Sequence, residues 1–229
     1  DVQVIEVTIN DLNESPEFVT TASLPDAEED SDYSITISTS DPDVGDTRAF
    51  SSTGLPAWLT MQDNNDGTAS LVGTPSQVDI GTVSFTLDIE DAGGLVRSRT
   101  FSFTVNNVND SSVFTSADTF SVEENTRAAG FIEATDEDGD TPEYAITGGD
   151  DASLFSIDAI TGKFGFISDP DFESPRDANK DNVYDLIVSA DDGTGSANAV
   201  STQLIKVSVT DLPDEDLSPI IDNDNTAGS

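Results

Sequence analysis

The run DANKDNVYD holds the residues whose spacing most clearly suggests chemistry. Oxygen-bearing side chains stand at alternate positions, at Asp177, Asn179, Asp181 and Asp185, and Val183 can offer a backbone carbonyl between them. Oxygens of this kind are ligands of hard cations, and Ca²⁺ takes about six to eight of them. The spacing matches the start of an EF-hand loop without its Gly and its closing Glu. The run therefore predicts a local calcium site, and a solvated acidic turn is the alternative interpretation.

Two residue types that serve much of protein chemistry are missing from the sequence. There is no Cys, so disulfides, thiolate metal sites and a Cys nucleophile are excluded. There is also no His, the commonest general base and transition-metal ligand. An enzyme would need paired carboxylates in a cleft, whereas the carboxylates here fall in turns between predicted strands. We therefore expect no enzymatic activity.

Charge narrows the range of partners. The chain has 46 Asp and Glu against 8 Lys and Arg, a formal net charge of −38. Nucleic acid is excluded, because phosphates are bound by cationic side chains, and an anionic membrane surface is disfavoured. No apolar run is long enough to span a bilayer, so we expect no direct membrane insertion. Repulsion among the carboxylates should destabilise a compact chain unless cations offset it. Adaptation of the surface to salt is an alternative explanation that could contribute to the acidic composition.

The elements that must position these carboxylates are β-strands. Residues 33–39, 82–91, 99–105, 182–190 and 202–209 alternate apolar with polar residues or run in β-branched and aromatic residues. Clusters of Gly, Pro, Asn and Asp separate them, and no sustained helical period is present. The pattern predicts an all-β chain.

An internal repeat divides the chain. VTINDLNESPEF (7–18) recurs as FTVNNVNDSSVF (103–114), displaced by 96 residues, and VSVTDLPDED (207–216) is a looser third copy. We expect two tandem Greek-key β-sandwiches. The predicted divisions are 1–13 for the last strand and connector of a preceding repeat, 14–110 and 111–212 for the two domains, and 213–229 for a connector or tail.

Several motifs of the second unit stand in the order typical of cadherin repeats. They are SVEEN (121–125), EATDEDGD (133–140), LFSIDAITGKF (154–164), PDFE (170–173), YDLIVSADDG (184–193) and KVSVTD (206–211). This unit resembles a cadherin domain, and its insertion after PDFE looks like the variant in bacterial surface cadherin-like repeats. The first unit resembles a dystroglycan-type cadherin-like domain through YSITISTSDPDVGDT (33–47), GLPAWLTM (54–61) and DIGTVSFTLDIEDAGG (79–94). The resemblance implies immunoglobulin-like, cadherin-like sandwiches.

The resemblance also implies several Ca²⁺ ions at the domain junctions. At the start of the first unit the implied ligands are Asp11, Asn13, Glu14, Asp41, Asp43 and Asp91. Between the two units they are Glu29 (with Glu28 or Asp30 as alternatives), Asn107, Val108 through its carbonyl, Asn109, Asp110, Asp136, Asp138 and Asp192. At the end of the second unit they are Glu124, Asp171, Glu173, Asp211 and Asp214. The first unit has GTP where the second has PDFE, and Pro213 replaces a usual Asn, so both ends depart from the family pattern.

These features predict an extracellular repeat of a large secreted or cell-surface adhesin, bacterial in origin, made rigid by calcium. Its first partners are neighbouring repeats of the same chain. The alternative is a module that binds surface polysaccharide or another copy of itself. Trp58 is interpreted as a core anchor rather than a sugar-stacking platform, and Tyr33, Tyr144 and Tyr184 as packing residues. QDNNDGT (62–68) is interpreted as a plain hairpin turn.

Overall fold

The computed structural model describes residues 3–4, 6–7 and 12–212 of the 229-residue chain. The chain forms two compact units, of which the first ends at Val108 and the second begins at Asn109. Among the described residues, regular structure is β apart from two three-residue 3₁₀ helices, as the alternating pattern predicts. No helical segment in these ranges combines the length and apolarity that crossing a bilayer requires.

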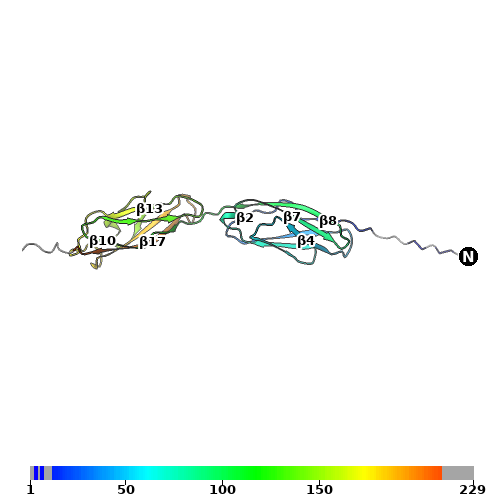
Figure 1. Ribbon diagram of the computed structural model, residues 1–229, viewed down its shortest axis with the longest axis horizontal. Helices are drawn as coiled ribbons and strands as arrows, with labels where there is room; N and C mark the ends of the chain where they lie inside the picture. The colour runs from blue at the N-terminus through cyan, green and yellow to red at the C-terminus, as the bar shows by residue number, and fades with distance from the viewer. Residues whose placement is uncertain (1–2, 5, 8–11, 213–229) are drawn as a thin grey trace, which may run out of the picture. The chain divides into compact units, whose positions relative to one another are not determined.

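Unit 1 consists of short and long strands in two sheets (Figure 1). Its elements are β1 (Glu17–Phe18), β2 (Ala27–Glu28), β3 (Tyr33–Ser40), β4 (Arg48–Thr53), β5 (Leu59–Asp63), β6 (Thr68–Gly73), the 3₁₀ helix η1 (Gln77–Asp79), β7 (Gly81–Asp91) and β8 (Val96–Asn106). One sheet has the order β1-β3-β6-β5 and the other β2-β8-β7-β4, with non-consecutive neighbours in both. All pairs are antiparallel except β2 with β8.

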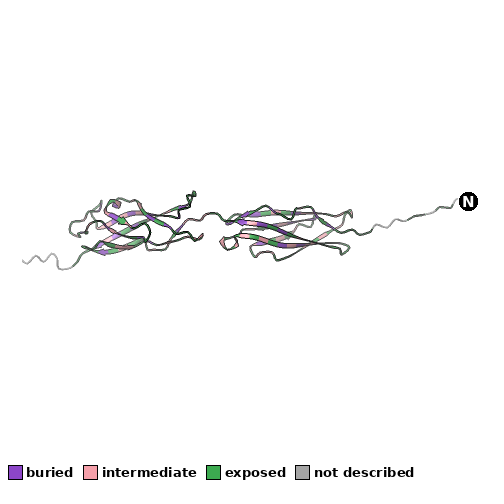
Figure 2. Ribbon diagram, turned by 90° about the horizontal axis from the view of Figure 1, so that it is seen from above, coloured by how far each residue is buried: buried purple, intermediate pink, exposed green. Residues whose placement is uncertain are grey.

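The core of unit 1 follows from the alternation in its long strands. Ile37 and Leu71 of one sheet and Leu87, Ile89 and Phe101 of the other are fully buried. Figure 2 shows the buried positions recurring along the strands between exposed ones. Burial of a side chain of this size stabilises a fold by about 1.5–3 kcal/mol, so the two sheets form a sandwich around this core.

Unit 2 has the same kind of core with a different division of its sheets. Its elements are β9 (Val113–Phe114), β10 (Thr119–Glu123), β11 (Ala128–Phe131), β12 (Ala134–Thr135), β13 (Glu143–Gly148), η2 (Ala152–Leu154), β14 (Phe155–Ile157), β15 (Lys163–Phe166), β16 (Val183–Asp191) and β17 (Val200–Thr210). The sheets are β10-β17-β16-β13, β11-β15-β14 and the pair β12-β9. Tyr184, Leu186, Val188 and Ala190 alternate inward along β16 and pack in the core cluster that also holds Phe164.

The interpretations of the aromatic residues and of the hairpin are confirmed. Trp58 packs against the unit 1 core, with its ring edge-on to those of Tyr33 and Phe103, and Tyr33, Tyr144 and Tyr184 are buried. Residues 62–68 connect β5 to β6, closed by the Asn64 N–H donating to the Thr68 carbonyl at 3.0 Å.

Candidate metal centre

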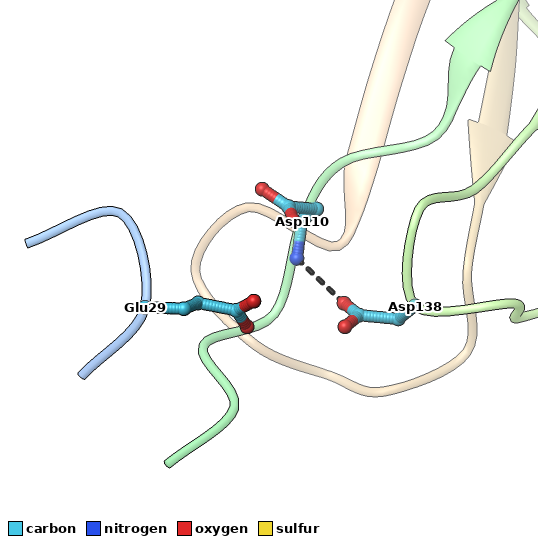
Figure 3. Close-up of side chains that lie close together, drawn as sticks. All are labelled: Glu29, Asp110 and Asp138. Atoms are coloured by element: carbon cyan, nitrogen blue, oxygen red, sulfur yellow. Dashed lines mark hydrogen bonds between the residues drawn. The ribbon is translucent and has the colours of Figure 1, made fainter. Parts of the chain in front are cut away.

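The chain enters unit 2 through a network of carboxylates. We call the end at which the chain enters a unit its entry end. The end at which the last long strand of the unit finishes is called its exit end. The Asn109 amide donates to Asp192 Oδ2 at 2.9 Å, and the Asp110 N–H donates to Asp138 Oδ2 at 2.8 Å (Figure 3). Asp136 Oδ1 accepts the Asp138 N–H at 3.0 Å. Three predicted pieces, the connector, the DEDGD turn and the ADDG turn, thus meet at this end of unit 2.

The entry end of unit 1 has the same bonds at the equivalent positions. The Asn13 amide donates to Asp91 Oδ2 at 3.0 Å, and the Glu14 N–H donates to Asp43 Oδ2 at 2.7 Å. Asp41 Oδ1 accepts the Asp43 N–H at 2.9 Å. Since the two units share this arrangement bond for bond, it is a repeated design and not an accident of one acidic turn.

Each entry end also gathers three carboxylates into a tight group. Ligand oxygens of Asp41, Asp43 and Asp46 lie within 4.8 Å of one another, as do those of Asp136, Asp138 and Asp140. Two like charges at this separation repel by ~1–4 kcal/mol, depending on the local dielectric. Asp46 and Asp140 were not among the predicted ligands, although Asp46 closes the DPDVGD turn and Asp140 continues the alternate acidic spacing of DEDGD.

The donor chemistry of these groups fits a hard cation. Every candidate ligand atom is an oxygen, which suits Ca²⁺ and offers transition metals neither nitrogen nor sulfur. Asp41 Oδ2 is a buried oxygen with no hydrogen-bond partner in the described part of the chain. A buried carboxylate oxygen left without a hydrogen bond costs free energy, and a bound cation would remove that cost.

Neighbouring groups lower the pKa of one carboxylate of the predicted set. Hydrogen bonds from the Asn109 amide and from the Thr194 side chain and N–H hold the pKa of the Asp192 carboxyl below its usual range. Bonds to the charged form have this effect because they are lost or weakened on protonation. Asp192 is therefore ionised and available as a ligand throughout the physiological pH range.

The exit ends are each organised by one buried glutamate. Glu124, 1% exposed, accepts the Leu212 N–H at 2.8 Å with one oxygen and the Phe172 N–H at 2.9 Å with the other. Its oxygens group with those of Glu173 and Asp211 within 4.8 Å. In unit 1, Glu29 is equally buried and accepts the Val108 N–H at 2.6 Å. Both carboxylates thus fasten the chain as it leaves the last strand of their unit.

The remaining predicted ligands have separate places. Asp171 Oδ1 accepts the Ser174 N–H at 2.8 Å and so caps its own turn, and Asn107 is exposed directly after β8. Asp11 and Asp214 lie outside the described residues.

The predicted loop site at 177–185 has a different organisation from the EF-hand spacing. Asp177 is 2% exposed, and its two oxygens accept the N–H groups of Asp181 at 2.8 Å and Asn182 at 3.3 Å. The Asn179 amide donates to Asp181 at 2.9 Å, and Asp181 Oδ1 accepts the Val183 N–H at 2.9 Å. These bonds are those of a self-capped turn, in which carboxylates replace backbone acceptors.

Asp185 departs most from the predicted loop. Its carboxylate pairs with Lys206 Nζ at 2.8 Å on the neighbouring strand β17. A buried partner of this loop was not predicted: Asp151 accepts the Ala178 N–H and the Asp185 N–H, both at 2.8 Å. Asp151 follows two glycines in GGDD, with no local spacing that points to residues 178 and 185.

Comparisons with known proteins agree with this architecture. A family model described as a putative Ig domain matches residues 16–106. The protocadherin-like wing polarity protein stan of Drosophila melanogaster is 39% identical over 95 residues, which are 40% of this chain and 2% of that protein. The chain therefore spans only a small part of this curated relative.

Two solved structures share the fold. The chain matches protocadherin gamma B2 extracellular cadherin domains 1–5 with a TM-score of 0.59 at 22% identity, covering 89% of this chain and 42% of the other. It matches human protocadherin-24 EC1-2 with a TM-score of 0.58 at 21% identity, covering 87% and 100%. The fold is thus an all-β sandwich of the cadherin-like, immunoglobulin-like type, which confirms the predicted fold class.

Proposed function

We propose that this chain is a calcium-binding, calcium-rigidified extracellular repeat of a large adhesin, which holds neighbouring repeats in line. The observation that carries the proposal is the repetition of one network at both entry ends. Asn13 with Asp91 and Glu14 with Asp43 correspond to Asn109 with Asp192 and Asp110 with Asp138. The likeness to extracellular cadherin domains of a protocadherin and to a protocadherin-like protein supports the same proposal.

Chain connectivity supports placing one set of ligands at the junction. Glu29 fastens Val108, the last residue of unit 1, and Asn109, the next residue, bonds to Asp192 of unit 2. Acidic side chains from both units are therefore tied to consecutive residues of a single connector. A Ca²⁺ ion bound beside this connector would supply positive charge to a segment that acidic side chains hold. The connector would then lose freedom, because residues 107–110 would be fixed by both units.

The function does not require tight binding. Extracellular calcium modules operate with Kd values of ~10⁻⁴–10⁻³ M, and a chain with a net charge of −38 gains stability from any bound cation. We further propose that the parent is a bacterial surface or secreted protein, on the basis of the 174–182 insertion and the lack of Cys.

No specific contact favours the alternative of glycan binding through Trp58. Its ring is half-buried against the unit 1 core in edge-to-face contacts with Tyr33 and Phe103, which is a packing role.

The proposal is tested by adding and removing calcium. At a free calcium concentration about ten times Kd, each site should stabilise its unit by about 1.4 kcal/mol. For a domain of this size, each kcal/mol raises the melting temperature by about 4–8 °C. Calorimetry of the full chain in CaCl₂, in MgCl₂ and in chelator would measure the melting temperatures, and small-angle scattering the particle length. We expect calcium to raise the melting temperatures and to increase the particle length. Magnesium should be much less effective in both. Identical melting and scattering in CaCl₂ and chelator would contradict the proposal.

A further inference from the structure

Unit 1 contains a polar pocket beside the candidate metal groups. It lies between the turn that leads into β4 and the hairpin that joins β5 to β6, and it is lined by residues 45–48 and 65–67. Its volume is about 240 Å³, below the ~300–1,000 Å³ of pockets for drug-sized ligands. The pocket therefore suits a small polar molecule of about the size of one sugar ring.

Arg48 brings an unused hydrogen-bond donor to this pocket. Its Nε is buried and has no hydrogen-bond partner among the residues that the structure describes. The guanidinium group lies directly against Gly67, where a Cβ would overlap it, so a glycine is needed at this place. A buried donor without a partner costs free energy. A ligand oxygen in the pocket would remove that cost.

Hydrogen bonds fix the hairpin wall of the pocket. The Asn65 N–H donates to Asp63 Oδ1 at 2.8 Å, and Asp63 Oδ2 accepts the Phe50 N–H at 3.3 Å, which ties the hairpin to β4. The Gly67 carbonyl accepts the Thr39 hydroxyl at 2.7 Å. Because these contacts form without a ligand, the wall is already ordered, and binding would lose little conformational freedom.

The lining groups select the chemical class of the ligand. Arg48 offers only donors, whereas the carboxylates of Asp46 and Asp66 offer only acceptors. The Thr47 hydroxyl and the Asn65 amide can do both. An anion would meet two carboxylates, and a cation would meet the guanidinium group. A neutral molecule with several hydroxyl groups, each of them donor and acceptor, can satisfy the whole lining.

Unit 2 has no equivalent of this donor. Its turn DEDGDT is followed by Pro142, whereas the corresponding turn of unit 1 is followed by Arg48. Another hollow, in unit 2, does contain an arginine, Arg127. That guanidinium group is already paired, because its Nε and Nη2 donate to the two oxygens of Asp169 at 2.6 and 3.3 Å. The unused arginine donor therefore distinguishes the unit 1 pocket from the repeated design of the two units.

We infer that this pocket binds a neutral saccharide, one ring of which lies between the turn and the hairpin. Arg48 donates to its hydroxyl oxygens, and the carboxylates of Asp46 and Asp66 accept its hydroxyl hydrogens. The site does not involve Trp58, which packs against the core. The inference goes beyond the proposed function, since unit 1 would carry a glycan site as well as hold its neighbours. Arg48 is no candidate calcium ligand, so the two proposals can be tested separately.

The test titrates the full chain in CaCl₂ with the neutral methyl glycosides of glucose, galactose and mannose. Parallel titrations use inorganic phosphate and glucuronate as anionic probes. The Nε–H resonance of Arg48 in ¹⁵N-correlated NMR spectra reports the buried donor directly. We expect at least one neutral glycoside to shift this resonance and the Gly67 amide saturably. Arg48→Met should weaken this binding about tenfold or more. The matched control Arg127→Met, which removes an arginine from the other hollow, should leave it unchanged.

Three outcomes would overturn the inference. They are an Arg48 resonance that no neutral glycoside moves, a shift produced by phosphate or glucuronate alone, and equal affinities of Arg48→Met and the parent chain. Thr47→Val keeps the shape of an exposed side chain and removes its hydroxyl, so it serves if Arg48→Met does not fold, and it should weaken binding severalfold. Calcium titration calorimetry should give the same isotherm for Arg48→Met and the parent, which separates this inference from the proposed function.

Discussion

The two exit ends begin alike and then diverge. In each unit the buried glutamate is followed by a residue with positive φ, Asp30 at 54° and Asn125 at 59°. The N–H groups of these residues donate to the carbonyls of Pro75 and Pro170, at 2.8 and 2.9 Å. The two prolines thus mark equivalent positions, although no sequence motif around them is shared.

The residues after the two prolines differ in chemistry. Pro170 is followed by Asp171, Phe172 and Glu173, whereas Pro75 is followed by Ser76, Gln77 and Val78. In unit 2 the Phe172 N–H bonds to Glu124, and Glu173 joins the carboxylate group. In unit 1 the same stretch forms the 3₁₀ helix η1, with Ser76 bonded to Asp79 Oδ2. The comparison shows that one backbone frame can carry either a multi-carboxylate end or a capped helical turn.

The largest expected effect is on the glutamate that organises the unit 2 exit end. Glu124→Ala would remove the buried carboxylate that accepts the N–H groups of Leu212 and Phe172, and a hydrogen bond to a charged group contributes about 1.5–3 kcal/mol. We expect the free energy of unfolding of unit 2 to fall by about 3 kcal/mol in chelator, measured by denaturation followed by circular dichroism. Trp58, the single tryptophan and part of unit 1, reports that unit separately by fluorescence.

The matched control for this change is Glu173→Ala, which removes the same charge from an exposed residue of the same group. Substitutions of exposed residues usually change the free energy of unfolding by no more than about 0.5 kcal/mol. Loss of one repelling charge from the group should offset even this small decrease in stability. An equal loss of stability in the two variants would show that Glu124 does not fasten the exit end.

A smaller effect is expected from giving unit 1 an acidic residue of the unit 2 type. Val78 is 91% exposed and stands three residues after Pro75, as Glu173 stands three after Pro170. We expect Val78→Glu to strengthen calcium binding by the full chain about tenfold, or about 1.4 kcal/mol, in titration calorimetry. Val78→Gln, of similar size without the charge, should leave it unchanged. Identical isotherms for the two variants would mean that the missing acid does not account for the difference between exit ends.

The smallest effect concerns an entry end. Because the Asn109 amide stabilises ionised Asp192, Asn109→Ala should raise the pKa of the Asp192 carboxyl toward its ordinary value of ~3.9. A lowered pKa contributes stability above the unfolded-state value, and this is lost as pH falls through the folded-state value. The variant should thus be less stable than the parent chain at neutral pH, and the difference should shrink as the pH falls through the folded-state pKa of Asp192. NMR titration of Asp192 would measure the shift, with Asn13→Ala as a control that leaves it unchanged.

Much of the fold could be predicted because its signal is local. Strands such as β7 and β16 show clear alternation, and each buries apolar residues at every second position. The connector and the DxD turns repeat in the sequence, so Asn109, Asp110, Asp136 and Asp138 could be grouped from the sequence alone. Their hydrogen bonds follow from the topology, which brings the connector and both turns to one end of the sandwich.

The organisation of the 177–185 loop could not be predicted from its spacing. Oxygens at alternate positions are needed both by a cation and by a turn that caps its own N–H groups, and the sequence is the same for both. The contacts that organise the loop come from elsewhere in the chain: Asp151 reaches it from a distant segment to hold Ala178 and Asp185. Lys206 lies opposite Asp185 only through the β16–β17 register.

The parallel pairing in each unit has a consequence for mechanical load. β10 runs parallel to β17 over five residue pairs, from Thr119 with Lys206 to Glu123 with Thr210, whereas β2 runs parallel to β8 over two, Ala27 with Val105 and Glu28 with Asn106. Tension on a chain leaving through the last strand pulls such a ladder along its length, so its hydrogen bonds must shear together and cannot unzip one at a time. Unit 2 should therefore withstand the greater pulling force, and unit 1 should be the first to extend when the chain is stretched.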